Sequence, residues 1–184
     1  TGLMNIVDVL EGTPQPWSAS EWRCAAPARV IQRTGVHDAA LLSISEFIEN
    51  APRAQRLCNA CDLIVIQNHL FGPVLEKVQH WKAKGKAVIV DFDASPLLLP
   101  KTLKKGEPSP DSMQPWHGDF SNFNPPSLAT QFRLGLRLVD GATVSTYPLA
   151  NDWQGLTNMQ VLPTFIDTDQ YCQITALEHQ GVVI

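Results

Sequence analysis

A strand-helix-strand unit in residues 61–96 constrains the fold of this chain more than any other feature. Two short apolar runs, 63–66 and 87–90, are rich in β-branched residues and contain no polar residue, as is typical of parallel strands buried on both faces. Between them, residues 73–84 carry apolar side chains at helical spacing, with a proline in the first turn and Gly85 directly after the last. The pattern predicts two parallel strands joined by a crossover helix, which is right-handed in about 98% of such units.

The polar residues that follow these two strands are the first candidates for a functional site. Because both strands end at the same edge of the sheet, we expect Gln67, Asn68 and His69 to lie beside Asp91 and Asp93. In open α/β sheets, ligands bind at this carboxyl edge.

The rest of the chain extends the unit into an α/β domain. Further strands are expected at 5–10, 39–44, 142–146 and 160–163, with an apolar run at 182–184 that resembles the start of another. Helices are expected from about 27 to 35, from 45 to 58 with an interruption at Pro52, and from 128 to 139. Together these elements predict a Rossmann-like, doubly wound fold with a mostly parallel sheet of about seven strands and helices on both faces.

Charge and hydropathy exclude several classes of partner. The formal net charge is −4 and the isoelectric point is about 5.7, which gives no electrostatic basis for binding nucleic acid or an anionic membrane surface. No apolar run approaches the ~20 residues of a membrane span, and the start of the chain lacks the pattern of a signal peptide. We therefore expect a cytoplasmic protein with no transmembrane segment and no nucleic-acid partner.

The four cysteines allow a redox or a zinc interpretation, and neither fits well. Cys58 and Cys61 are spaced like a redox pair, but such a pair usually follows a strand and opens a helix, whereas this one precedes a strand. A zinc site would need a second pair of ligands, and Cys24 and Cys172 stand alone. We expect ordinary reduced cysteines, since free cysteine is among the most buried residue types, and no metal site.

A proline-rich stretch at 94–126 contains several lysines and aromatic residues and has no periodic pattern. A loop of this length inside a domain is usually functional or mobile. It is either a lid over the carboxyl edge or an insertion that contacts nothing.

Asp91-Phe92-Asp93, directly after a buried strand, resembles the first motif of the haloacid-dehalogenase-like phosphatases. This resemblance would imply phosphohydrolase chemistry. That family also needs a later lysine, and this chain has none beyond Lys105. The chain also lacks the G-x-S-x-G elbow, the G-x-G-x-x-G dinucleotide motif and the P-loop.

A third interpretation comes from a resemblance that spans about residues 5–170. The order of motifs is similar to that of the N-terminal domain of GT-B glycosyltransferases of the family 4 or "group 1" kind. The matching pieces are R-x-x-x-P-A at 23–28, C-D-L-I-V-I-Q at 61–67, K-x-K-G-K-A-V-I-V-D-F-D at 82–93, V-D-G-A-T-V-S-T-x-x-L-A at 139–150 and V-L-P-T-F-I-D at 161–167. Ala94 and Thr164 depart from the family pattern, which has aspartate and asparagine there.

The resemblance implies an activity and a division of the chain. Residues 5–170 would be the acceptor-side domain, and 171–184 a linker into a missing C-terminal domain that binds most of the donor. The whole protein would transfer a sugar from a nucleotide-sugar to a glycan, lipid or other acceptor in cell-surface polysaccharide biosynthesis, with no further cofactor. This piece alone would be inactive. The alternatives are a haloacid-dehalogenase-like phosphohydrolase and a non-catalytic α/β ligand-binding module.

The same resemblance places the acceptor at the carboxyl edge. If the reaction inverts the anomeric centre, Asp93 is the expected general base, because it lies nearer the opening than Asp91. The expected acceptor-binding residues are Gly12, Arg23, His69, Asp91 and Thr146. Gly12 would allow close approach of a ligand, and Arg23 would hold an anionic group of the acceptor.

Overall fold

Six parallel strands form one sheet in the part of the chain that the computed structural model describes, residues 2–12, 18–94 and 128–164. The strands are β1 (Asn5–Leu10), β2 (Asp38–Ser43), β3 (Leu63–Gln67), β4 (Ala87–Phe92), β5 (Gly141–Val144) and β6 (Met159–Val161). This confirms the Rossmann-like α/β fold, with six strands among the described residues where the sequence suggested about seven. The expected strand at 182–184 lies outside the described residues.

In the strand order β2-β1-β3-β4-β5-β6, the direction in which successive strands are added to the sheet reverses once. The chain first moves outward from β1 to β2, and then crosses to the other side of β1 to form β3. The order therefore reverses beside β1 and β3, and this is the switch point at which doubly wound sheets bind ligands.

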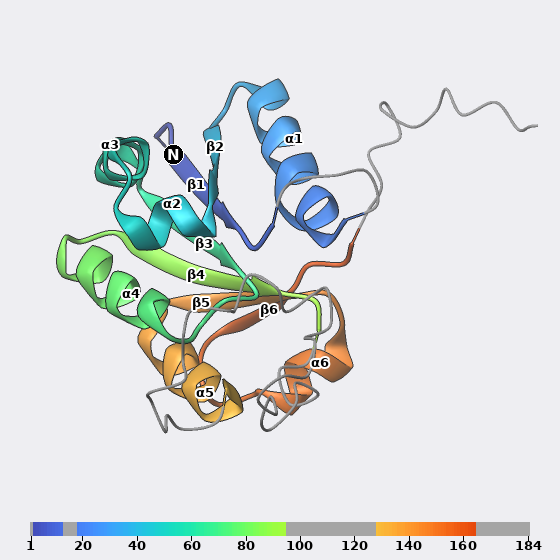
Figure 1. The fold of residues 1–184 in the computed structure, drawn as a ribbon. Helices are drawn as coiled ribbons and strands as arrows, with labels where there is room; N and C mark the ends of the chain where they lie inside the picture. The colour runs from blue at the N-terminus through green and yellow to red at the C-terminus, as the bar shows by residue number, and fades with distance from the viewer. Residues whose placement is uncertain (1, 13–17, 95–127, 165–184) are drawn as a thin grey trace, which may run out of the picture.

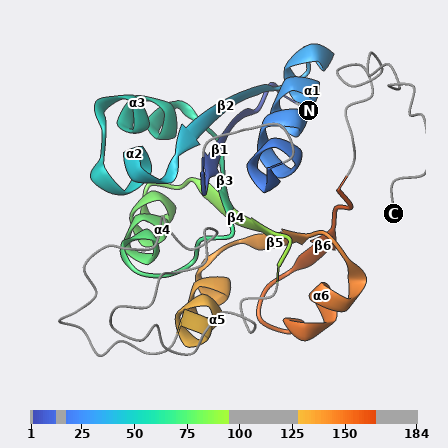
Figure 2. The ribbon, with the colours of Figure 1, turned by 45° about the vertical axis from the view of Figure 1, so that its right-hand side comes forward.

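Helices cover the two faces of the sheet unequally, as Figures 1 and 2 show. One face carries a π-helical turn, η1 (Glu21–Ala25), which runs directly into α1 (Ala26–Thr34). The other face is covered by α2 (Ile44–Glu49), α3 (Pro52–Ala60), α4 (Pro73–Ala83) and α5 (Leu128–Leu138), with α6 (Tyr147–Asp152) beside β6. The main apolar core lies under this second group of helices, where alternate residues of β1, β3, β4 and β5 are buried.

Local sequence signals explain how the expected helix at 45–58 becomes two. Ser43 and Glu46 form a capping box at the start of α2, in which the Ser43 hydroxyl accepts from the Glu46 N–H at 3.3 Å. Asn50 ends α2 with a left-handed backbone conformation (φ 58°), and Pro52 then begins α3.

The close packing of α5 fixes the loop that follows β3. A Cβ atom at Gly135 would lie 2.6 Å from Leu70 Cβ, so only glycine fits at this position. The side-chain oxygen of Gln131 also accepts a hydrogen bond from the Gly72 N–H at 2.9 Å. These contacts hold the segment 68–72 at the carboxyl edge.

One short helix differs from the expectation. The segment after β5 forms α6, where the sequence indicated only a chain leaving a strand. Thr146 caps it, because its hydroxyl accepts from the Leu149 N–H at 3.4 Å, and the buried Trp153 that follows packs edge-on against Phe132. Among the described helices, none is long and apolar enough to cross a membrane.

Candidate functional site

Residues at the ends of four strands, together with Arg23 of η1, lie at the carboxyl edge of the sheet. The contributing residues are Glu11 and Gly12 after β1, Arg23 in η1, Gln67 to His69 at the end of β3, Asp91 and Asp93 at the end of β4, and Thr143 to Thr146 at the end of β5. We call this set the rim.

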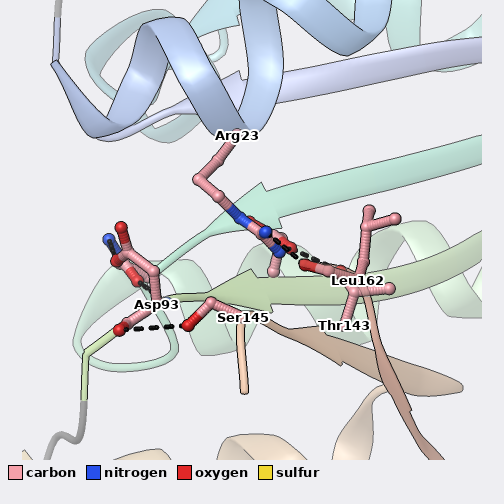
Figure 3. Close-up of polar contacts among 7 residues, drawn as sticks. Arg23, Asp93, Thr143, Ser145 and Leu162 are labelled. Atoms are coloured by element: carbon pink, nitrogen blue, oxygen red, sulfur yellow. Dashed lines mark hydrogen bonds and ion pairs between the residues drawn. The ribbon is translucent and has the colours of Figure 1, made fainter. Parts of the chain in front are cut away.

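A buried ion pair lies at the centre of the rim. Arg23 Nε donates to Asp91 Oδ2 at 2.9 Å, and Arg23 Nη2 pairs with Asp91 Oδ1. The Thr143 hydroxyl donates to the same carboxylate, and Arg23 Nη1 donates to the carbonyl of Leu162. Figure 3 shows Arg23 extending from its helical turn toward Thr143 and Leu162. One guanidinium therefore connects η1, β4 and the chain leaving β6.

This pair changes the interpretation of Arg23. The two side chains are only 2% and 3% exposed. Burial opposes the charge on Arg23, but the hydrogen bond and charge of Asp91 outweigh it and raise the pKa of Arg23. Arg23 thus has its partner inside the protein, where the sequence suggested an anionic acceptor group. Its role as an acceptor ligand stays a prediction.

A second buried carboxyl group, Asp8, lies in the middle of β1. Burial raises its pKa to about 7, and the negative charge of Asp91 adds to this. Burial, and after it the charge of Asp8, also raises the pKa of the Cys24 thiol. Cys24 therefore remains protonated and unreactive. Sequence reasoning missed Asp8, although an aspartate within an apolar strand was the available signal.

Asp93 lies directly after β4 and is half-buried, in contrast to the buried Asp91. Asn68 contacts it twice: Asn68 Nδ2 lies 3.4 Å from Asp93 Oδ1, and Asn68 Oδ1 accepts from the Asp93 N–H at 3.4 Å. The Ser145 hydroxyl donates to the Asp93 carbonyl at 3.4 Å (Figure 3). The backbone and one carboxylate oxygen of Asp93 are thereby oriented by neighbouring strands.

Asn68 also connects Asp93 to Glu11, a residue that the sequence analysis did not select. Asn68 Nδ2 donates to Glu11 Oε2 at 2.9 Å. Gln67 holds the backbone directly after β1, because its side-chain oxygen accepts hydrogen bonds from the Glu11 N–H at 3.1 Å and from the Ser20 hydroxyl at 2.9 Å. Glu11 follows directly after a parallel strand, so the rule that selected Asp93 would also have found it.

The remaining candidates differ in their accessibility. His69 is buried and stacks on Phe71 with ring centroids 4.5 Å apart; burial lowers its pKa to about 3, so it is neutral at ordinary pH. Gly12 is exposed, and among the described residues a Cβ there would meet only the Ser20 hydroxyl, at 4.0 Å. Thr146 is exposed and caps α6. Gly12 and Thr146 are therefore exposed and Asp93 is half-buried, whereas His69 is buried.

The described cysteines are buried free thiols. Cys58 lies in the last turn of α3 and Cys61 directly after that helix, so neither benefits from a helix N-terminus. Within residues 2–12, 18–94 and 128–164, no group of three or more histidine, cysteine or acidic residues could hold a metal ion. Cys172, the expected linker at 171–184 and, apart from Ala94, the expected lid at 94–126 lie outside the described residues.

Comparison of the chain with protein-family models gives no match, and comparison with curated proteins gives none either. The fold and the residues of the rim are therefore the features that indicate a function.

Proposed function

We propose that this chain is the acceptor-side half of a two-domain GT-B glycosyltransferase, which transfers a sugar from a nucleotide-sugar donor to an acceptor hydroxyl. The observation that carries the proposal is Asp93, a half-buried carboxylate oriented at the carboxyl edge of a doubly wound sheet. The order of motifs described above, from R-x-x-x-P-A to V-L-P-T-F-I-D, is the second line of support.

The position of Asp93 supports a role as the general base. A general base must come within about 2.6–3.2 Å of the hydroxyl whose proton it removes. Asp93 is only half-buried, whereas Asp91 is enclosed by Arg23 and Thr143. In an inverting transfer, Asp93 would accept the proton as the acceptor oxygen attacks the anomeric carbon.

The other rim residues would then have distinct roles. The buried pair of Arg23 and Asp91 holds the end of β4, and with it Asp93, in a fixed position. Gly12 and Thr146 are exposed at the same edge and would contact the acceptor.

The phosphohydrolase alternative gains no support from this geometry. In the haloacid-dehalogenase-like family the first aspartate of the motif is the nucleophile, and here that residue is Asp91. Its carboxylate is 3% exposed and paired with Arg23, so a phosphate ester could reach it only after the ion pair had separated.

A donor screen with the full-length protein tests the proposal. Radiolabelled nucleotide-sugars are incubated with the protein and a mixture of glycan and lipid-linked acceptors. We expect transfer from at least one donor, and none from the 184-residue chain alone, because the donor contacts of this family lie mostly in the second domain. Phosphate release from generic phosphate esters without any sugar transfer would contradict the proposal.

A further inference from the structure

Asn68 has a backbone conformation that is uncommon for a residue with a side chain. Its φ is 53°, in the left-handed region, and it follows β3 directly. Its N–H donates to the carbonyl of Asp91 at 2.8 Å, which fixes the residue against β4. Among the described non-glycine residues, only Asn50 also has a positive φ. Residues in such sparsely populated backbone conformations cluster at functional sites.

The side chain of Asn68 lies between two carboxylates from different strands. Its Nδ2 is 2.9 Å from Glu11 Oε2 and 3.4 Å from Asp93 Oδ1. An amide nitrogen has two N–H donors, so it can give one to each carboxylate. Without such a bridge, two negative groups repel one another and would turn apart.

We propose that Asn68 is a positioning residue that holds the carboxylates of Glu11 and Asp93 side by side, so that they accept hydrogen bonds from two neighbouring hydroxyl groups of one acceptor sugar. This deepens the proposed function and rests on it. Ionised carboxylates only accept hydrogen bonds, and the hydroxyl groups of a sugar donate them. The guanidinium of Arg23, at the same edge of the sheet, is already paired with Asp91. The rim therefore suits a hydroxyl-rich acceptor better than a phosphate group.

The positioning contact is tested in the 184-residue chain by nuclear magnetic resonance, without any activity assay. In Asn68→Gly, the Asp93 N–H loses its acceptor, and we expect its amide exchange to accelerate about tenfold, the effect of one lost hydrogen bond. The carboxyl carbon resonances of Glu11 and Asp93 should shift together. Asn50→Gly is the matched control, since it makes the same substitution at the same backbone conformation in the C-cap of α2. Unchanged exchange and unchanged carboxyl resonances in Asn68→Gly would overturn the proposal.

The catalytic consequence is tested in the full-length protein. Asn68→Gly should lower kcat for a glycan acceptor by about 10- to 100-fold, the cost of a misplaced reacting group. Asn68→Asp keeps the shape and the left-handed tolerance but replaces the bridging amide by a third carboxylate, so it should not restore kcat, and it should alter the pH profile. A kcat equal to that of wild type in both variants would overturn the positioning role. If wild type itself transfers no sugar, the proposed function fails, while the resonance experiment still decides whether Asn68 holds the two carboxylates.

Discussion

Arg23 and Asp91, 68 residues apart in the sequence, form a buried bidentate ion pair that joins η1 to the end of β4. The same guanidinium reaches the carbonyl of Leu162, where the chain leaves β6. The Arg23 guanidinium therefore links η1, the end of β4 and the chain after β6 at the edge where Asp93 lies.

Removing one partner of this pair should destabilise the protein strongly. In Arg23→Met, Asp91 is left buried without its counter-charge, and we expect the free energy of unfolding to fall by about 3–5 kcal/mol, measured by urea denaturation. Lys82→Met is the matched control, because Lys82 and Asp140 form an ion pair on the surface, with side chains 33% and 43% exposed. That change should cost no more than about 1 kcal/mol. Equal losses of unfolding free energy in the two variants would show that the buried pair stabilises the protein no more than a surface pair does.

Asp8 should make stability depend on pH. Its carboxyl ionises near pH 3.8 in the unfolded chain and at about 7 in the folded one, so the folded state binds the additional proton between these values. The contribution of Asp8 is therefore present below pH 3.8 and is lost as the pH rises toward 7. Asp8→Asn should gain stability relative to wild type over this range, by up to a few kcal/mol at pH 8. Urea denaturation from pH 4 to 8 measures the difference, and a constant difference across the range would refute the buried carboxyl.

His69 should make stability depend on pH in the opposite direction. Its pKa falls from 6.5 in the unfolded chain to about 3 in the folded one because it is buried. Its contribution is present above pH 6.5 and is lost as the pH falls toward 3. His69→Phe retains an aromatic ring to stack on Phe71, and its stability relative to wild type should increase from pH 6.5 down to pH 4. If this difference does not change with pH, His69 is not buried in its neutral form.

Gly135 should resist even the smallest side chain. Alanine in a helix interior is normally favoured over glycine by about 1 kcal/mol, but here the new methyl group would lie 2.6 Å from Leu70 Cβ. We expect Gly135→Ala to destabilise the protein by about 1–3 kcal/mol through overpacking, as judged from thermal unfolding. Gly12→Ala is the control, because its nearest neighbour would be 4.0 Å away, and it should be neutral. A stabilised Gly135→Ala would mean that α5 does not approach the 68–72 loop closely.

The sequence predicted the framework of the fold well because the framework depends on local patterns. The apolar runs at 63–66 and 87–90 became β3 and β4 with small changes in their ends. Pro52 marked the break between α2 and α3. In contrast, α6 has only six residues, which is too short for a helical period to be visible.

The rim was predictable only as a location. Strand ends can be read from sequence, and parallel strands bring Asp93 and Asn68 to one edge. The partner of Arg23 could not be read in this way, since a contact across 68 residues depends on how η1 packs over the sheet. The close approach of Leu70 to Gly135 is likewise a property of tertiary packing. It cannot be predicted from a single glycine within a helix.

The most direct test of the account is kcat of the full-length protein with Asp93→Asn, measured with a donor found by the screen. We expect kcat to fall by about 100-fold or more, the magnitude expected for a missing general base, with the urea midpoint unchanged. Asp38→Asn removes an exposed carboxylate at the start of β2, on the opposite edge of the sheet, and should retain the wild-type kcat. A kcat for Asp93→Asn equal to that of Asp38→Asn would contradict the account and remove Asp93 from the mechanism.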